Sequence, residues 1–484
     1  NEMIELIPER EGSRKAQILV DLEVFENAEA IYFELAKAGN TDVLEDLASL
    51  YFNKASVFIS LDDLTSALRM YDKVINIYDK LVFNENRTEL ASDLVNAYLD
   101  KGHTLQEKGD FQFALAVYDQ TIKLLKWSNE REYSAENANG IAKAYMNKGV
   151  ANFLLQNQQE AISFIDQAIE IWVRLVDQEG FLQAEQLLGL AYLSKVNSLK
   201  ALGENALANE TIDKALIIYE TQVHQKDNKN MRHRLSMVYE TKAAILGDIG
   251  EHQEAVLYYD KAIRIEENLF HQEGRSEFAN ELAVTYLNKA NSLVILGEYE
   301  SALSHYNKSM TTWERLIYQE GRSELEINVA FVYTLITRVH HEMGDYDSAI
   351  AYHDKAIEIG ERLVNQQKKT EFRPFLAGAY QNKTLTLIQL KLHTDAISLL
   401  DKAIKIREQL VNDEGKVEFL GDLAVIKKKK ADVLLSIGEV NQAKSVLEAV
   451  IPILESEIKR TDRGNLKNCL ATAMEALNRI RDTQ

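Results

Sequence analysis

The apolar positions of this chain recur at helical spacing, in pairs of segments separated by a short polar break. Between residues 235 and 246 the apolar residues step by three or four positions, and residues 255–265 repeat that spacing. The break between them, GDIGEHQ, contains Gly250, which can adopt the left-handed conformation that ends many helices. The pattern predicts two amphipathic helices joined by a tight turn.

This two-helix pattern repeats with a period of 47 residues. A turn glycine with an alanine five residues later marks six copies, and a different turn residue keeps the same register in three more. The glycine copies are Gly109/Ala114, Gly203/Ala208, Gly250/Ala255, Gly297/Ala302, Gly344/Ala349 and Gly438/Ala443, and the others are Asp62/Ala67, Gln156/Ala161 and Lys391/Ala396. A fixed period of this length indicates a stack of repeated helix pairs.

Three polar positions also recur in this register. A lysine lies eight residues before the turn, with the single exception of Ile336, and a tyrosine lies eleven before it, except for Lys427 in the last unit. An acid or amide lies ten residues after the turn: Asp72, Asp119, Asp166, Asp213, Asp260, Asn307, Asp354 and Asp401. We interpret this last series as helix-surface charge, because its members fall on separate units and do not form a catalytic carboxylate pair.

The repeats predict an all-α fold, a right-handed superhelical solenoid of antiparallel helix pairs. Residues 42–464 hold nine units, residues 15–41 hold the second-helix half of another, and residues 465–484 form a capping helix. Residues 1–14 are a lead-in. The half-unit would expose an apolar face, and the chain starts at Asn1 without an initiator Met, so we expect it to belong to a larger protein.

By period alone the units fall in the range of HEAT and armadillo repeats. The segment YLNKANSLVILGEYESALSHYNKSM, however, resembles the tetratricopeptide repeat in Tyr286, Ala290, Leu293, Gly297, Tyr299, Ala302, Tyr306 and Ser309. Each unit departs from that 34-residue family in its extra length, which we expect to extend the second helix and the link. The resemblance implies a protein-binding array whose first helices line an inner surface.

Composition and the absence of known motifs exclude several classes of function. A formal net charge of −20 argues against nucleic acid as a partner, and no apolar run is long enough to cross a membrane. Cys469 is the only cysteine, which excludes an internal disulfide or a Cys-based zinc site and fits a cytoplasmic protein. No phosphate-binding loop, nucleophile elbow or zinc-binding helix motif is present, so we expect no cofactor, no bound metal and no enzymatic activity.

Two local clusters are weak candidates for chemistry. His340 and His341 are adjacent on a helix, where their side chains point about 100° apart, so we interpret them as surface histidines and not as metal ligands. The basic run from Lys427 to Lys430 is either a solvated helix face or an anchor for an acidic peptide.

Recognition is expected at the positions that vary, ten and six residues before the turn on each first helix. They do not match the carboxylate clamp by which related domains hold chaperone tails. They are instead largely apolar up to Leu287 and polar from Thr334 onward, which suits an extended or helical partner segment. The candidate groove residues are Leu99, Met146, Leu193, Asn197, Leu287, Asn291, Arg338 and Lys428. The alternative is that these side chains pack between units.

These features predict a protein-interaction scaffold or sensor module that binds a protein or peptide segment in its concave groove, as the C-terminal arm of a signalling protein. The alternative is a structural protein that self-associates through the half-unit at 15–41 and forms an oligomer or filament. An enzyme with a site spread over several units is a third hypothesis, and nothing in the sequence requires it.

Overall fold

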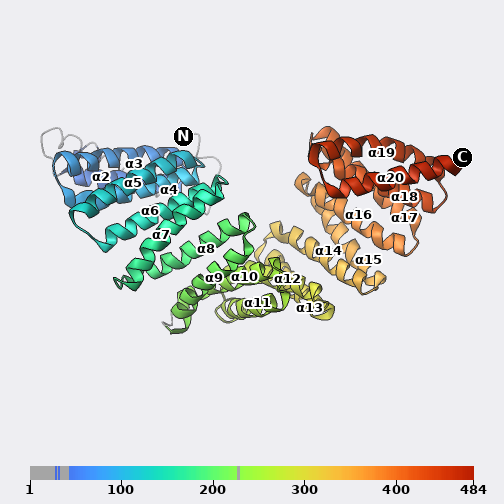
Figure 1. The fold of residues 1–484 in the computed structure, drawn as a ribbon, viewed down its shortest axis with the longest axis horizontal. Coiled ribbons are helices and arrows are strands. Elements are labelled where there is room, and N and C mark those ends of the chain that lie inside the picture. Colours follow the sequence, from blue (N-terminus) through green and yellow to red (C-terminus); the bar gives the residue numbers. More distant parts are fainter. Residues whose placement is uncertain (1–24, 26–27, 30, 33–42, 226–228, 484) are drawn as a thin grey trace. The chain divides into compact units, whose positions relative to one another are not determined.

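The computed structural model describes residues 43–225 and 229–483, with a few positions between 25 and 32 (Figure 1). The predicted lead-in and almost all of the predicted half-unit therefore lie outside the described residues. The chain divides into two compact units, Asn1–Gly250 and Glu251–Gln484. Within the described part of the chain, no helix has the length and apolar content needed to cross a membrane.

The first unit consists of helices that pack in chain order, each against the next. The first helices of successive pairs are also in contact: α4 contacts α6, and α6 contacts α8. The described helices are α2 (Val43–Ser60), α3 (Leu64–Asp79), α4 (Ala91–Glu107), α5 (Phe111–Arg131), α6 (Ala135–Leu154), α7 (Gln158–Asp177), α8 (Glu185–Ala201), α9 (Asn205–Glu220) and α10 (Arg232–Asp248).

The second unit continues the same order, again with each helix packed against the next. Its helices are α11 (His252–Glu267), α12 (Ala279–Ile295), α13 (Tyr299–Glu320), α14 (Glu326–Glu342), α15 (Tyr346–Glu361), α16 (Arg373–Gln389), α17 (His393–Glu408), α18 (Leu420–Ser436), α19 (Val440–Thr461) and α20 (Gly464–Thr483). The prediction of an all-α helical repeat solenoid is confirmed, since all regular structure in the described residues is helical.

The turn inside each helix pair depends on one residue in the left-handed conformation. Gly297 has φ +78°, and the next amide, of Glu298, donates to the carbonyl of Leu293 at 2.9 Å. Lys391 takes the same conformation with φ +60°, and the amide of Leu392 donates to the carbonyl of Leu387 at 2.8 Å. Turn geometry is therefore retained where glycine is replaced, at the cost of backbone strain.

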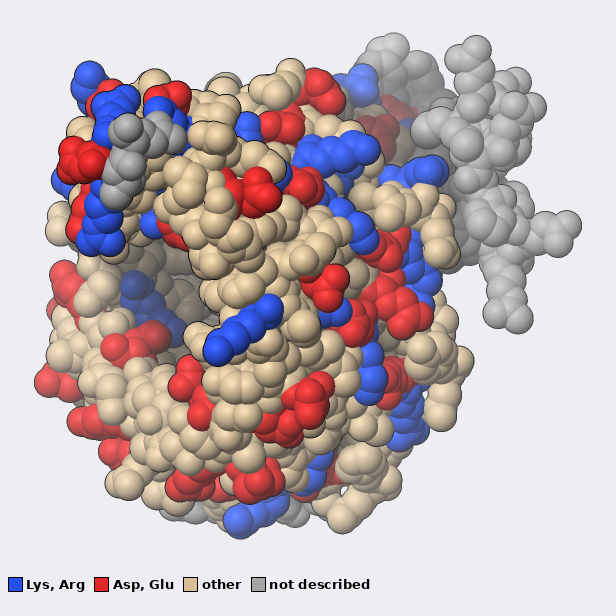
Figure 2. All heavy atoms as spheres, turned by 90° about the vertical axis from the view of Figure 1, so that its right-hand side faces the viewer, with Lys and Arg blue, Asp and Glu red and all other residues tan. Residues whose placement is uncertain are grey.

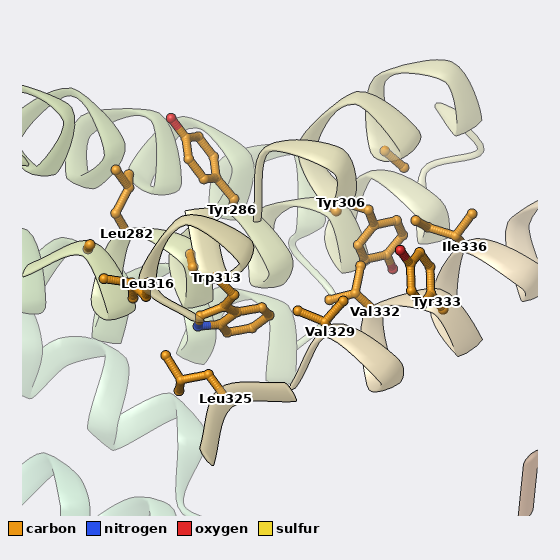
Figure 3. Packing of buried hydrophobic residues seen from close by; sticks show 14 of the residues in the cluster. Leu282, Tyr286, Tyr306, Trp313, Leu316, Leu325, Val329, Val332, Tyr333 and Ile336 are labelled. Carbon is orange, nitrogen blue, oxygen red and sulfur yellow. The ribbon is translucent and has the colours of Figure 1, made fainter. Parts of the chain in front are cut away.

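One of the hydrophobic clusters of the second unit runs between α12, α13 and α14 (Figure 3). Trp313 and Tyr306 of α13 point into it and are almost completely buried, and Ile336 of α14 closes one side. The indole nitrogen of Trp313 donates to Asn280 Oδ1 at 2.9 Å, which satisfies its polar atom inside the core. Periodic apolar residues thus become a continuous interior by stacking.

The recurrent lysine and aspartate turn out to be partners. Seven of these lysines, each on the first helix of a pair, contact the aspartate 29 residues earlier, on the second helix of the preceding pair, whereas Lys54 pairs with Glu29. Six of the Nζ–Oδ1 distances lie between 2.5 and 2.7 Å. We call each of these lysine–aspartate ion pairs a rung. In the described residues the rungs are Lys101–Asp72, Lys148–Asp119, Lys195–Asp166, Lys242–Asp213, Lys289–Asp260, Lys383–Asp354 and Lys430–Asp401.

At the junction between α13 and α14, both the lysine and the aspartate of the rung are replaced. Ile336 replaces the lysine and is fully buried, and the residue 29 positions earlier is Asn307 in place of an aspartate. A lysine there without a carboxylate, or a carboxylate without a lysine, would leave a half-covered charge unpaired. The two departures therefore compensate each other.

The second helices and the links that follow them contain further helical turns. Within the described residues, five second helices end in a π-helical turn, at Lys80–Asn84, Thr221–Gln225, Asn268–Gln272, Arg362–Gln366 and Gln409–Asp413. A short 3₁₀ turn such as Ser276–Phe278 then leads into the next first helix. These turns change the direction of the chain between consecutive helix pairs.

We expect the rung between Lys289 and Asp260 to be measurable by a double-mutant cycle. Its Nζ–Oδ1 distance is 2.6 Å, with the lysine side chain 9% and the carboxylate 47% exposed. Because the carboxylate is half solvated, the coupling between Lys289→Met and Asp260→Asn should be about 0.5–1 kcal/mol. Urea unfolding of the two single variants and the double variant measures it, and strictly additive effects would show that the pair contributes nothing.

Replacing a strained turn residue by glycine should stabilise the fold. Lys391→Gly relieves the cost of the left-handed conformation, and after the entropy cost of glycine the net gain should be about 0.5–1 kcal/mol. The reverse change in a matching turn, Gly297→Ala, should cost about 1 kcal/mol. Thermal unfolding of both variants tests this, and a lower midpoint for Lys391→Gly would contradict it.

Candidate partner-binding pocket

A pocket of about 390 Å³ opens between α14, α15 and α16 in the second unit. Positions 334, 338 and 341 of α14 follow helical spacing, so their side chains share one face of that helix. The lining residues are Thr334, Leu335, Thr337, Arg338, His341 and Glu342 of α14, His353 of α15, and Asn382, Leu385 and Thr386 of α16.

One wall of the pocket is a histidine at a position where four other helix pairs carry a tyrosine. His353 lies nine residues after its turn, and the equivalent residue Tyr306 reaches across its pair to donate its hydroxyl to Asn291 Oδ1 at 2.6 Å. Tyr118 does the same to Gln106 Oε1 at 2.6 Å. The imidazole of His353 is shorter than a phenol, and its Nε2 lies 3.3 Å from the hydroxyl of Thr386 on α16.

His353 forms the polar back wall of the pocket. The residue is 3% exposed, and its Nε2 lies 3.3 Å from the hydroxyl of Thr386. Burial lowers the pKa of His353 to about 4, and the positive charge of Lys383 acts in the same direction. The ring is therefore neutral near pH 7. Its Nδ1 has no hydrogen-bond partner among the described residues and is available to a ligand.

Arg338 supplies the positive charge at the rim. Its side chain is exposed, and no carboxylate oxygen of the described residues lies within 4 Å of it. The guanidinium lies beside the hydroxyl of Tyr306, where it opposes the rise in the pKa of that hydroxyl caused by burial. An unpaired arginine beside the apolar side chains of Leu335 and Leu385 can hold an acidic group next to an apolar one.

The adjacent histidines of α14 turn to different surroundings. His340 Nδ1 lies 3.2 Å from Asp345 Oδ2, and its ring stacks on Tyr352. His341 packs edge-on against Tyr346 and lines the pocket. Among the described residues, no three histidine, cysteine or acidic side chains are grouped so as to hold a metal ion.

All eight predicted groove residues lie on first helices. Their exposure differs: Asn197 and Arg338 are exposed, and the other six are partly buried. The first unit holds Leu99 in α4, Met146 in α6, and Leu193 and Asn197 in α8; the second holds Leu287 and Asn291 in α12, Arg338 in α14 and Lys428 in α18. Of these, Arg338 lines the pocket described above.

Several of the other predicted residues already have partners inside the protein. Leu99 packs against the core around Leu105 and Tyr118, and Leu287 packs against the core of the second unit. Lys428 pairs with Asp432 at 2.8 Å. These side chains support the fold, and a ligand would have to share them.

The basic run on α18 is largely neutralised by neighbouring carboxylates. Besides Lys428, Lys427 pairs with Glu408 at 2.6 Å, and Lys430 forms the rung with Asp401. Burial lowers the pKa of Lys429. On the face drawn in Figure 2, acidic and basic side chains are interspersed.

Sequence reasoning missed most of the pocket. His353 is the decisive residue, and its signal was available as the one histidine at a position otherwise occupied by tyrosine, isoleucine or leucine: Tyr71, Tyr118, Ile165, Ile212, Tyr259, Tyr306, Leu400 and Leu447. Asn382 and Thr386 carried no comparable signal, since they become pocket residues only when α16 packs beside α14.

Comparison with solved structures finds helical proteins of low sequence identity. The apo form of RapI matches with a TM-score of 0.47 and 15% identity, over 86% of this chain and 99% of that one. The apo form of the quorum sensor NprR from B. thuringiensis gives 0.43 and 17%, over 82% and 99%. BtubC from P. vanneervenii gives 0.41 and 20%, over 53% and 92%.

A search of curated protein sequences finds no match. Sequence models of the family described as tetratricopeptide repeat match four segments, residues 281–362 and residues 48–80, 142–171 and 238–269. These segments include turn residues and alanines in the register that runs through the chain. The chain is a member of the tetratricopeptide repeat superfamily.

Proposed function

We propose that this protein is an interaction scaffold that binds a segment of a partner protein on its first helices, with the pocket between α14 and α16 as an anchor point. The observation that carries the proposal is the unpaired guanidinium of Arg338 at the rim of a cavity lined by Leu335 and Leu385. A partner side chain of apolar character fills the cavity while a neighbouring carboxylate pairs with the arginine.

Exposed apolar side chains beside the pocket support this reading. Phe331 of α14 is 48% exposed and Leu385 of α16 is 45% exposed. Both lie on first helices, where most apolar residues are covered by neighbouring helices. Covering them with a partner segment removes apolar surface from water, at about 25 cal/mol for each Å².

The neutral state of His353 adds selectivity. A buried neutral imidazole can accept or donate one hydrogen bond through its free Nδ1 without bringing a charge into the cavity. The pocket therefore favours a neutral group at its base and an acidic group at its rim. Self-assembly through residues 15–41, the alternative from the sequence, concerns a segment outside the described residues, and no described contact favours it.

The test begins with selection of peptides from a displayed library on the full chain. The affinity of an enriched peptide is then measured for variants by fluorescence anisotropy. Leu385→Glu should weaken binding at least tenfold, because it places a carboxylate in the apolar part of the pocket. Arg338→Gln should weaken peptides with an acidic residue more than their amide counterparts.

The matched control is Leu257→Glu, which changes a 62% exposed leucine on the second helix α11. It should leave the affinity unchanged, because that side chain lies outside the pocket. Circular dichroism checks that each variant is folded. A library that yields no binding peptide, or wild-type affinity in folded Leu385→Glu, would rule out this pocket as the anchor.

A further inference from the structure

A second pocket, of about 260 Å³, lies in the first unit and differs from the first in chemistry. Four helices and two short turns line it. Its polar residues are Asn139 and Lys143 of α6, Gln183 before α8, Gln186 of α8, Tyr219 of α9 and Arg234 of α10, and its apolar residues are Leu187, Leu190 and Met231. None of these residues belongs to the recurrent lysine, tyrosine or aspartate positions. Asn139 accepts from Trp172 as Asn280 does from Trp313, so packing of the repeats explains that residue, but neither Lys143 nor Arg234 makes a contact of this kind among the described residues.

Two cations face this pocket without a counter-ion. Lys143 and Arg234 are both exposed, and no carboxylate oxygen of the described residues lies within 4 Å of either one. In a chain with net charge −20, where most lysines on first helices pair with an aspartate, two unpaired cations lining one cavity are unusual. They set up a local positive potential there.

The buried hydroxyl of Tyr219 is a second indication of a ligand, independent of the two cations. Tyr219 is fully buried, and its hydroxyl lies near the guanidinium of Arg234 but makes no hydrogen bond of normal geometry among the described residues. Buried hydroxyls are nearly always satisfied, so this one indicates a missing partner in the pocket. The ring reaches this place because residue 189 is a glycine, where an added Cβ would lie 2.9 Å from Tyr219 Cε2.

The tyrosine acts as a donor. Burial raises the pKa of Tyr219, and the guanidinium of Arg234 opposes this only in part, so the hydroxyl keeps its proton. Asn139 Oδ1 accepts from the indole of Trp172 at 2.8 Å, which leaves the amide nitrogen of Asn139 to donate. With Lys143 and Arg234, the site offers an ammonium, a guanidinium, a hydroxyl and an amide, all able to donate.

We propose that this pocket binds an anionic oxygen group, a carboxylate or a phosphate, carried on an acidic segment of a partner protein; this rests on the interaction function proposed above. Convergent donors with two positive charges are complementary to such a group and to no neutral one. The site lies wholly in the first unit and shares no residue with the pocket between α14 and α16.

The test uses the full chain and three fluorescein-labelled, amidated peptides of the same length. One contains glutamates, the second has glutamine at the same positions, and the third has phosphoserine there. Fluorescence anisotropy at low salt should show binding of the glutamate peptide, the phosphoserine peptide or both, and none of the glutamine peptide. Which of the two binds identifies the source of the anionic group.

Variants assign the binding to the pocket. Lys143→Gln and Arg234→Gln should each weaken the anionic peptide about tenfold, and Tyr219→Phe a few-fold, because each removes one donor to an anion. The matched control Lys123→Gln removes another exposed lysine, on α5, that has no ion-pair partner among the described residues, and it should bind as wild type does.

Weaker binding by Lys143→Gln and Arg234→Gln, together with wild-type affinity of Lys123→Gln, assigns the anionic peptide to this site and not to the pocket of the second unit. Lys143 and Arg234 are exposed, so their variants are expected to fold, and circular dichroism confirms it. Absence of binding by both anionic peptides would overturn the proposal. So would an affinity that Lys143→Gln and Arg234→Gln leave unchanged.

Discussion

The close approach of the two helices in each pair is the constraint on which the rest of the structure depends. It is possible because the residue five positions after the turn carries only a methyl group, and in all nine pairs that residue is an alanine with 0% exposure: Ala67, Ala114, Ala161, Ala208, Ala255, Ala302, Ala349, Ala396 and Ala443. A larger side chain there would force the helices apart. Their separation in turn determines where the left-handed turn residue lies and how far a tyrosine or histidine reaches across the pair.

The recurrent positions were sufficient to predict the helix pairs, because a fixed period places the same residues in the same packing environment in every copy. They did not reveal that the lysine and aspartate series are partners, since periodicity gives the face of a helix and not its neighbour. The simultaneous loss of both at Ile336 and Asn307 was a readable sign of that pairing. The π-helical turns had no sequence signal, because they follow from how the link closes between packed pairs.

The binding surfaces were harder to predict for a physical reason. A cavity forms where packing leaves volume unfilled, and this depends on side chains from three or four helices at once. Arg338 was identified because it varies within a recurrent position, whereas His353 lines the pocket from a second helix, where no binding residue was expected. Tyr219 likewise depends on Gly189, which admits its ring. Variation at one position suggests specificity, and the shape of the site comes from combinations of positions.

The junction between Ile336 and Asn307 has a consequence for how such a chain can change during evolution. Units joined by a lysine–aspartate rung present identical connectors, so one of them can be duplicated, deleted or moved by recombination and still fit its new neighbours. The unit that begins with α14 best matches a preceding unit with an amide at the position of Asn307, because an aspartate there would have no lysine partner. Gene-level shuffling can therefore lengthen the array on either side of this junction, while the two units that form it are inherited together.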